Sequence, residues 1–145
     1  MINILIIIIT GILGAIMTFY VSHYYKQGPV RASALLSLLV GLFFYFFPEM
    51  LNNYLTKNIP VVFIGTSFIG MISTTTKRSY VHLAIAGFLF SIIYINKNNL
   101  FQGFGGALGA LAFIALLTTF AFSFAFSKSV HKLKAVLRLR RRKSS

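Results

Sequence analysis

Five long apolar runs, separated by short polar breaks, form the pattern of hydrophobic and polar positions along this chain. The runs cover residues 2–20, 32–47, 59–74, 80–95 and 104–126. A helix needs about 20 residues to cross the hydrocarbon core of a bilayer, and tilt or local thinning accommodates shorter ones. The pattern therefore predicts an all-α integral membrane protein in which five transmembrane helices form a bundle.

The third run, residues 59–74, admits a second interpretation because it is the most polar of the five. It can enter and leave the bilayer on the same side as a re-entrant segment, and the chain then has four spans. The first run also resembles a signal peptide in position, but it lacks a basic n-region and a small-residue cleavage site, so we expect a retained helix. Six of the seven tyrosines fall near the predicted span ends, where aromatic belts form.

The Lys and Arg residues are distributed unequally between the two predicted sides. With five spans, one side holds twelve of the 14 and the other side holds two; with four spans, the division is eleven to three. Cytoplasmic segments are enriched in Lys and Arg, so both topologies place the C-terminus in the cytoplasm. The five-span topology places the N-terminus outside, and we expect a plasma membrane location, which in a bacterium is the inner membrane.

The last 19 residues form a segment of different character. We divide the chain into a transmembrane bundle, residues 1–126, and a basic cytoplasmic tail, residues 127–145, which as a helix has an apolar face and a basic face. Each Lys or Arg near an anionic leaflet contributes about 1 kcal/mol, so we expect the tail to lie on anionic lipid headgroups. The tail has no interleaved aromatic residues, and we therefore expect no nucleic-acid partner. The predicted headgroup contacts are Lys132, Lys134, Arg138, Arg140, Arg141 and Arg142.

The composition excludes several classes of function for this chain. Hydrophobic residues make up 57% and charged residues 10%, against about 25% charged residues in soluble domains, which excludes a soluble domain. Glu49 is the only acidic residue, next to Pro48 at the end of the second run, and the chain has no cysteine. The three histidines are scattered, and we expect His82 to be buried with a Ser or Thr partner. These absences predict no catalytic residues, no metal, no cofactor and no enzyme activity.

Small residues four positions apart mark the helix faces on which neighbouring backbones can approach. In the second run Ser37 and Gly41 have this spacing, and in the fifth run Gly105 and Gly109 have it. We predict that these residues form helix–helix contacts within the bundle, with a dimer interface through the fifth helix as the alternative. The first and fourth runs carry similar pairs: Gly11 with Ala15, and Gly87 with Ser91.

Hydroxyl and glycine residues gather in the third run, at Thr66, Ser67, Gly70 and Thr74. Such residues can line a polar pathway through the membrane, or they can pack and hydrogen-bond against their own and neighbouring helices. The first role predicts a small oligomeric transporter or channel for a small solute or ion. The second predicts a non-catalytic accessory, assembly or interaction subunit of a larger membrane complex, which is the function we expect.

Overall fold

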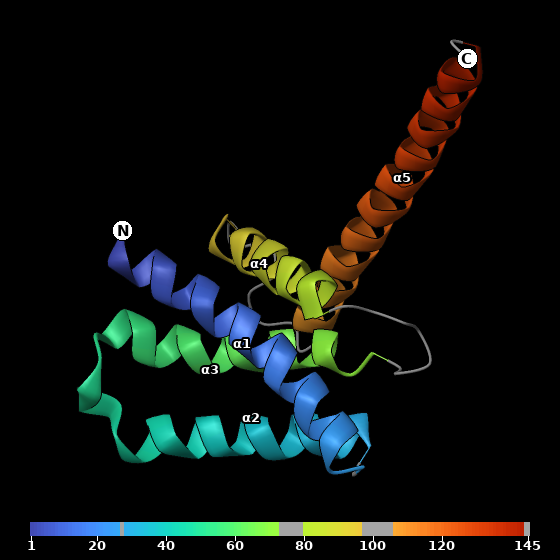
Figure 1. The fold of residues 1–145 in the computed structure, drawn as a ribbon. Helices are drawn as coiled ribbons and strands as arrows, with labels where there is room; N and C mark the ends of the chain where they lie inside the picture. Colours follow the sequence, from blue (N-terminus) through green and yellow to red (C-terminus); the bar gives the residue numbers. More distant parts are fainter. Residues whose placement is uncertain (27, 73–79, 97–105, 144–145) are drawn as a thin grey trace.

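The computed structural model describes residues 1–26, 28–72, 80–96 and 106–143, with side chains up to residue 126. Five α-helices contain most of these residues, and no strand occurs among them (Figure 1). The all-α prediction is therefore confirmed for the described part of the chain. The helices are α1 (Ile2–Tyr24), α2 (Pro29–Phe46), α3 (Asn53–Gly70), α4 (Tyr80–Asn96) and α5 (Ala107–Lys143), and a short 3-10 turn, η1 (Pro48–Met50), precedes α3.

Two helix boundaries differ from those that hydropathy predicts. Helix α3 begins at Asn53, six residues before the third apolar run, and includes Lys57 and Pro60. The backbone N–H groups of Leu55 and Thr56 donate to the carbonyl of Asn52, which starts the helix in a polar stretch. Helix α5 continues without a break from the apolar run to Lys143, so the predicted boundary between bundle and tail falls inside one helix.

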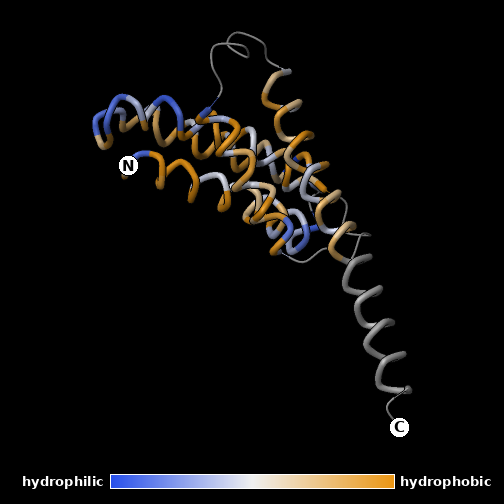
Figure 2. The backbone as a smooth tube through the Cα atoms, turned by 90° about the horizontal axis from the view of Figure 1, so that it is seen from above, coloured by the Kyte–Doolittle hydropathy of each residue, from blue (hydrophilic) through white to orange (hydrophobic). Residues whose placement is uncertain are grey.

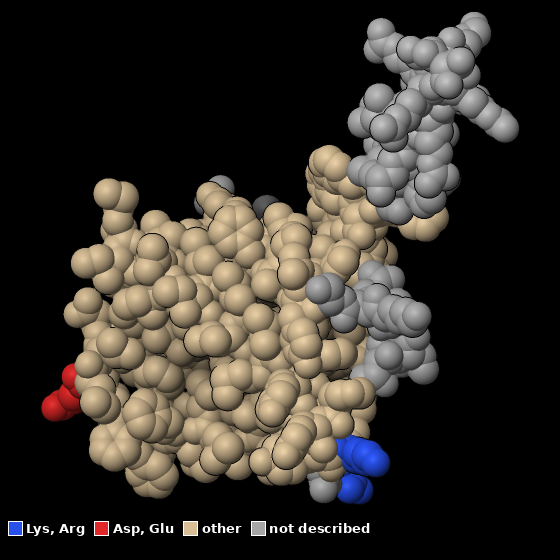
Figure 3. All heavy atoms as spheres, viewed as in Figure 1, with Lys and Arg blue, Asp and Glu red and all other residues tan. Residues whose placement is uncertain are grey.

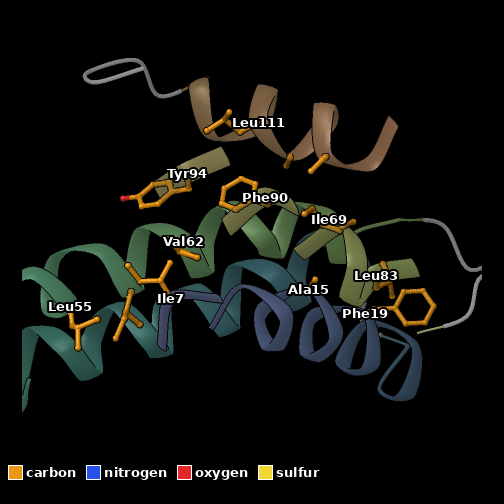
Figure 4. Close-up of a cluster of buried hydrophobic side chains, with 14 residues drawn as sticks. Ile7, Ala15, Phe19, Leu55, Val62, Ile69, Leu83, Phe90, Tyr94 and Leu111 are labelled. Atoms are coloured by element: carbon orange, nitrogen blue, oxygen red, sulfur yellow. The ribbon is translucent and has the colours of Figure 1, made fainter. Parts of the chain in front are cut away.

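Consecutive helices run in opposite directions. In Figure 4, α1 and α3 run one way, from Leu55 toward Ile69 in α3, whereas α4 runs the opposite way, from Leu83 toward Tyr94. Ser33 in the first turns of α2 is hydrogen-bonded to Ser67 near the end of α3, and Asn58 in the first turns of α3 is hydrogen-bonded to Tyr94 near the end of α4. His82 near the start of α4 is hydrogen-bonded to Ser123 near the middle of α5. The bundle therefore has two ends, which we call the Glu49 end and the Lys26 end.

Helices α1 and α3 lie in the middle of the bundle, and α2 lies at its edge. Helix α1 packs against α2, α3 and α4, and α3 packs against the other four helices. Only Ala32 and Ser33 of α2 are buried, whereas nine residues of α3 are buried. Helix α3, which is less apolar than α1, α2 and α4, is therefore the helix that its neighbours shield best.

Three helical segments are long and apolar enough to cross a membrane: Ile2–Tyr24, Pro29–Phe46 and Ala107–Phe126. Helix α4 is apolar but one residue shorter than the shortest of these, and α3 carries polar residues in its first turns. Figure 2 shows hydrophobic residues along most of the described helices, with hydrophilic residues toward the helix ends. The fold is therefore compatible with a membrane protein.

Candidate functional site

Three serines meet between α2 and α3. The hydroxyl of Ser67 donates to the carbonyl of Ile64 at 2.7 Å. Since its one proton is used there, Ser33 at 2.7 Å and Ser37 at 3.4 Å donate to the Ser67 oxygen. Two of the predicted residues, Ser37 and Ser67, are thus brought together in an interhelical hydrogen-bond cluster.

Thr66 lies on another side of α3, where it contacts Gly14 of α1. Its side chain is completely buried, and its hydroxyl donates to the carbonyls of Val62 at 2.9 Å and Phe63 at 3.2 Å. The hydroxyl is therefore satisfied within its own helix. Such hydrogen bonds within one helix are typical of a hydroxyl at a packed helix–helix interface.

Glycines allow α1 to approach α3 and α4 at backbone distance. A Cβ built on Gly70 would lie 2.5 Å from the carbonyl oxygen of Ala15 and 2.7 Å from Cβ of Thr18. A Cβ built on Gly87 would lie 2.7 Å from the carbonyl oxygen of Gly11. Both distances are too short for any side chain, so these two crossings require glycine.

The remaining predicted residues have different surroundings. A Cβ built on Gly41 or on Gly109 would meet no atom within 4 Å, so neither glycine touches a neighbouring helix among the described residues. Thr74 and Gly105 lie outside the described residues, as do the side chains of the six basic tail residues. The close contacts of Gly14 and Gly65 were not among the predicted sites, although Gly14 has Thr10 and Thr18 at a spacing of four; Gly65 belongs to no such small-residue pair.

One half-buried histidine joins α4 to α5. The Nε2 atom of His82 lies 2.8 Å from the hydroxyl of Ser123, which confirms the predicted Ser or Thr partner. Its Nδ1 atom is buried and has no hydrogen-bond partner among the described residues. No group of three or more His, Cys, Asp or Glu residues that could hold a metal occurs in this part of the chain.

A cavity of about 390 Å³ opens at the Lys26 end, where the chain turns from α1 into α2. The turn uses two residues with positive φ, Lys26 at 51° and Gly28 at 85°, and Pro29 then begins α2 with its fixed φ. The cavity is lined by Ser22, His23, Lys26, Gly28, Pro29, Met71 and Ile72, so it lies between the ends of α1 and α3 and the start of α2.

Charge is divided between the two ends of the bundle. The only acidic residue of the chain, Glu49, is exposed in η1 at one edge of the molecule, and the Lys and Arg residues visible in Figure 3 lie at the opposite edge. The Lys26 end is therefore cationic and has no described carboxylate to neutralise it. Sequence reasoning missed this cavity, because a turn geometry creates it.

Together these features define a helical bundle with an apolar exterior, closely packed helix crossings and one cationic recess. Comparison of the chain with models of known protein families, with curated proteins and with solved structures found no match.

Proposed function

We propose that all five helices cross the plasma membrane, with the N-terminus outside and the Lys26 end and the C-terminus in the cytoplasm. The alternating helix directions support five crossings, and the cationic Lys26 end supports the orientation. Helix α3 has 18 residues in one uninterrupted helix, about 27 Å long at 1.5 Å per residue, close to the thickness of the hydrocarbon core. This length favours a span over a re-entrant segment.

Cysteine labelling tests the topology, since the chain has no cysteine of its own. Asn53→Cys and Thr76→Cys place single thiols on either side of α3 in the sequence. A membrane-impermeant maleimide added to intact cells should label Asn53→Cys only, and Thr76→Cys should react after the membrane is permeabilised. Labelling of both from the same side would refute five spans and support the re-entrant segment.

We further propose that the chain is a non-catalytic accessory or assembly subunit of a larger membrane complex. The observation that carries this proposal is the bonding of the hydroxyls in α3. Thr66 and Ser67 are fully buried and hydrogen-bonded to their own and adjacent helices, as in a packed interior. Gly41 of α2 is half-buried, and a Cβ built on it would meet no atom within 4 Å, which leaves room for the backbone of another membrane helix.

Two measurements on the full chain test this proposal. Purification in a mild detergent should yield a stoichiometric complex, and Gly41→Leu should dissociate it while the helix content of the chain is unchanged. Liposomes that contain only this chain should show no more ion flux than protein-free liposomes. Flux above that background, reduced by Ser67→Leu, would instead support the transporter or channel.

A further inference from the structure

The cavity at the Lys26 end has the features of an anion-binding site. Its volume of about 390 Å³ is within the range of small-ligand pockets, about 300–1,000 Å³. The ammonium group of Lys26, the hydroxyl of Ser22 and the imidazole of His23 supply polar donors from one helix end. Pro29, Met71 and Ile72 supply apolar walls on the other sides.

The positive charge at this cavity is not neutralised by a carboxylate of the described residues. The whole sequence has one acidic residue against 14 Lys and Arg, and that residue, Glu49, lies at the opposite end of the bundle. Lys26 therefore has no carboxylate of its own chain within reach, and neither has Arg31, two residues into α2. An anion bound beside these cations gains charge-assisted hydrogen bonds that the protein itself does not provide.

The surroundings of the cavity place it at the depth of lipid headgroups. Exposed tyrosines lie at the same end of the bundle: Tyr20, Tyr24 and Tyr25 near the end of α1, and Tyr80 at the start of α4. Tyrosines concentrate at the level where membrane meets water. A cavity at this level with one polar and one apolar side fits an amphiphilic anion.

One buried hydroxyl lies one helical turn from the cavity lining, although it does not itself line the cavity. Thr18 is one helical turn before Ser22 on α1 and packs against Gly70, the residue before Met71. Its hydroxyl is fully buried and has no hydrogen-bond partner among the described residues.

We propose that this cavity binds a phosphate group, with Lys26, Ser22 and His23 as the ligating side chains. The phosphate belongs either to an anionic phospholipid of the surrounding leaflet or to a free phosphate. The lipid source rests on the proposed membrane orientation, whereas the phosphate site itself does not. Binding in detergent solution therefore tests the site separately from the topology.

The experiment uses the full chain in detergent, with native mass spectrometry to titrate phosphatidylglycerol and phosphatidylcholine. A second titration with sodium phosphate, followed by calorimetry, tests the free anion. Lys26→Gln removes the charge from an exposed residue, and Ser22→Phe fills the cavity while it keeps every charge. Lys57→Gln removes one charge at the Glu49 end and is the matched control, because the tail contributes the same background to every variant.

We expect phosphatidylglycerol to bind more tightly than phosphatidylcholine, and both cavity variants to weaken it roughly tenfold or more, as expected for loss of a charged hydrogen bond. Lys57→Gln should change binding less than twofold. If only sodium phosphate binds, and both Lys26→Gln and Ser22→Phe abolish that binding, the phosphate site is supported and its ligand is the free anion. The proposal is overturned if Ser22→Phe and Lys26→Gln bind like the wild type, or if the two lysine variants weaken binding equally while Ser22→Phe has no effect.

Discussion

The contact between Gly11 of α1 and Gly87 of α4 allows a quantitative prediction. In Gly87→Ala the new Cβ would lie 2.7 Å from the carbonyl oxygen of Gly11, about 0.7 Å less than the 3.4 Å at which ordinary contact begins. The atoms that it meets are backbone atoms of α1, 3.1 Å or less away, which no rotamer change can move. The two helices must therefore separate, and this loosens the bond from the Ser91 hydroxyl to Ile7.

The matched control is Gly41→Ala, where a Cβ would meet nothing within 4 Å. Both substitutions gain the same helix propensity, about 1 kcal/mol, so the difference between them isolates the steric term. Overpacking of a well-packed interior costs about 1–3 kcal/mol. We expect Gly87→Ala to be less stable than Gly41→Ala by this amount.

Reversible unfolding in mixed micelles measures this difference. The helical circular dichroism of each purified variant is followed as the mole fraction of sodium dodecyl sulfate rises, and the free energies of unfolding are compared. Gly87→Ala should unfold at a lower detergent fraction than the wild type, and Gly41→Ala at the same or a higher one. Equal free energies for the two variants would refute the inferred backbone contact between α1 and α4.

Three further predictions concern the contact of Gly65 with Phe90, the hydrogen bond between Ser33 and Ser67, and the basic tail. Gly65→Ala pushes a Cβ into the ring of the fully buried Phe90, so the smaller side chain of Phe90→Leu should rescue it, with a coupling energy of about 1–2 kcal/mol in a double-mutant cycle; purely additive effects would contradict the contact. Ser67→Ala removes the partner of the buried Ser33 and should cost about 1 kcal/mol by the same unfolding assay, whereas adding Ser33→Ala should cost little more; a double variant twice as unstable as the single would argue against a shared bond. Trypsin cleavage in the basic tail should slow several-fold on vesicles that contain phosphatidylglycerol relative to phosphatidylcholine vesicles, because each Lys or Arg adds about 1 kcal/mol of attraction; equal cleavage rates would exclude a tail that lies on anionic lipid.

Hydropathy predicts the helices of this chain well and their polar ends poorly. The five apolar runs each correspond to a helix, because an apolar sequence of this length has few other ways to satisfy its backbone. Hydropathy places the start of α3 six residues too late because Asn53, Lys57 and Asn58 lower the hydropathy of its first turns. In the folded chain Asn58 accepts a hydrogen bond from the Tyr94 hydroxyl at 2.8 Å, a partner 36 positions away in sequence.

The spacing of small residues shows which helix faces permit a close approach, but it does not show which of these faces contact each other. Gly11 and Gly87 both belong to such pairs and they meet each other, whereas Gly41 belongs to a similar pair and meets nothing within the bundle. Lipid favours no particular helix face, so only the packing of all the helices decides between these outcomes. The cavity beside Lys26 has no signature of this kind, since it depends on backbone angles at a turn.

The central position of α1 has a consequence for how the chain is made. Helix α1 leaves the ribosome before α4 and completes its packing only with α4, since Ile7 accepts its bond from Ser91, 84 positions later in the chain. At about 5–20 residues per second, synthesis of the intervening segment takes about 4–17 s. During that interval α4 does not yet cover the side of α1 that carries Gly11. Assembly of this bundle therefore depends on what occupies that side of α1 before α4 arrives.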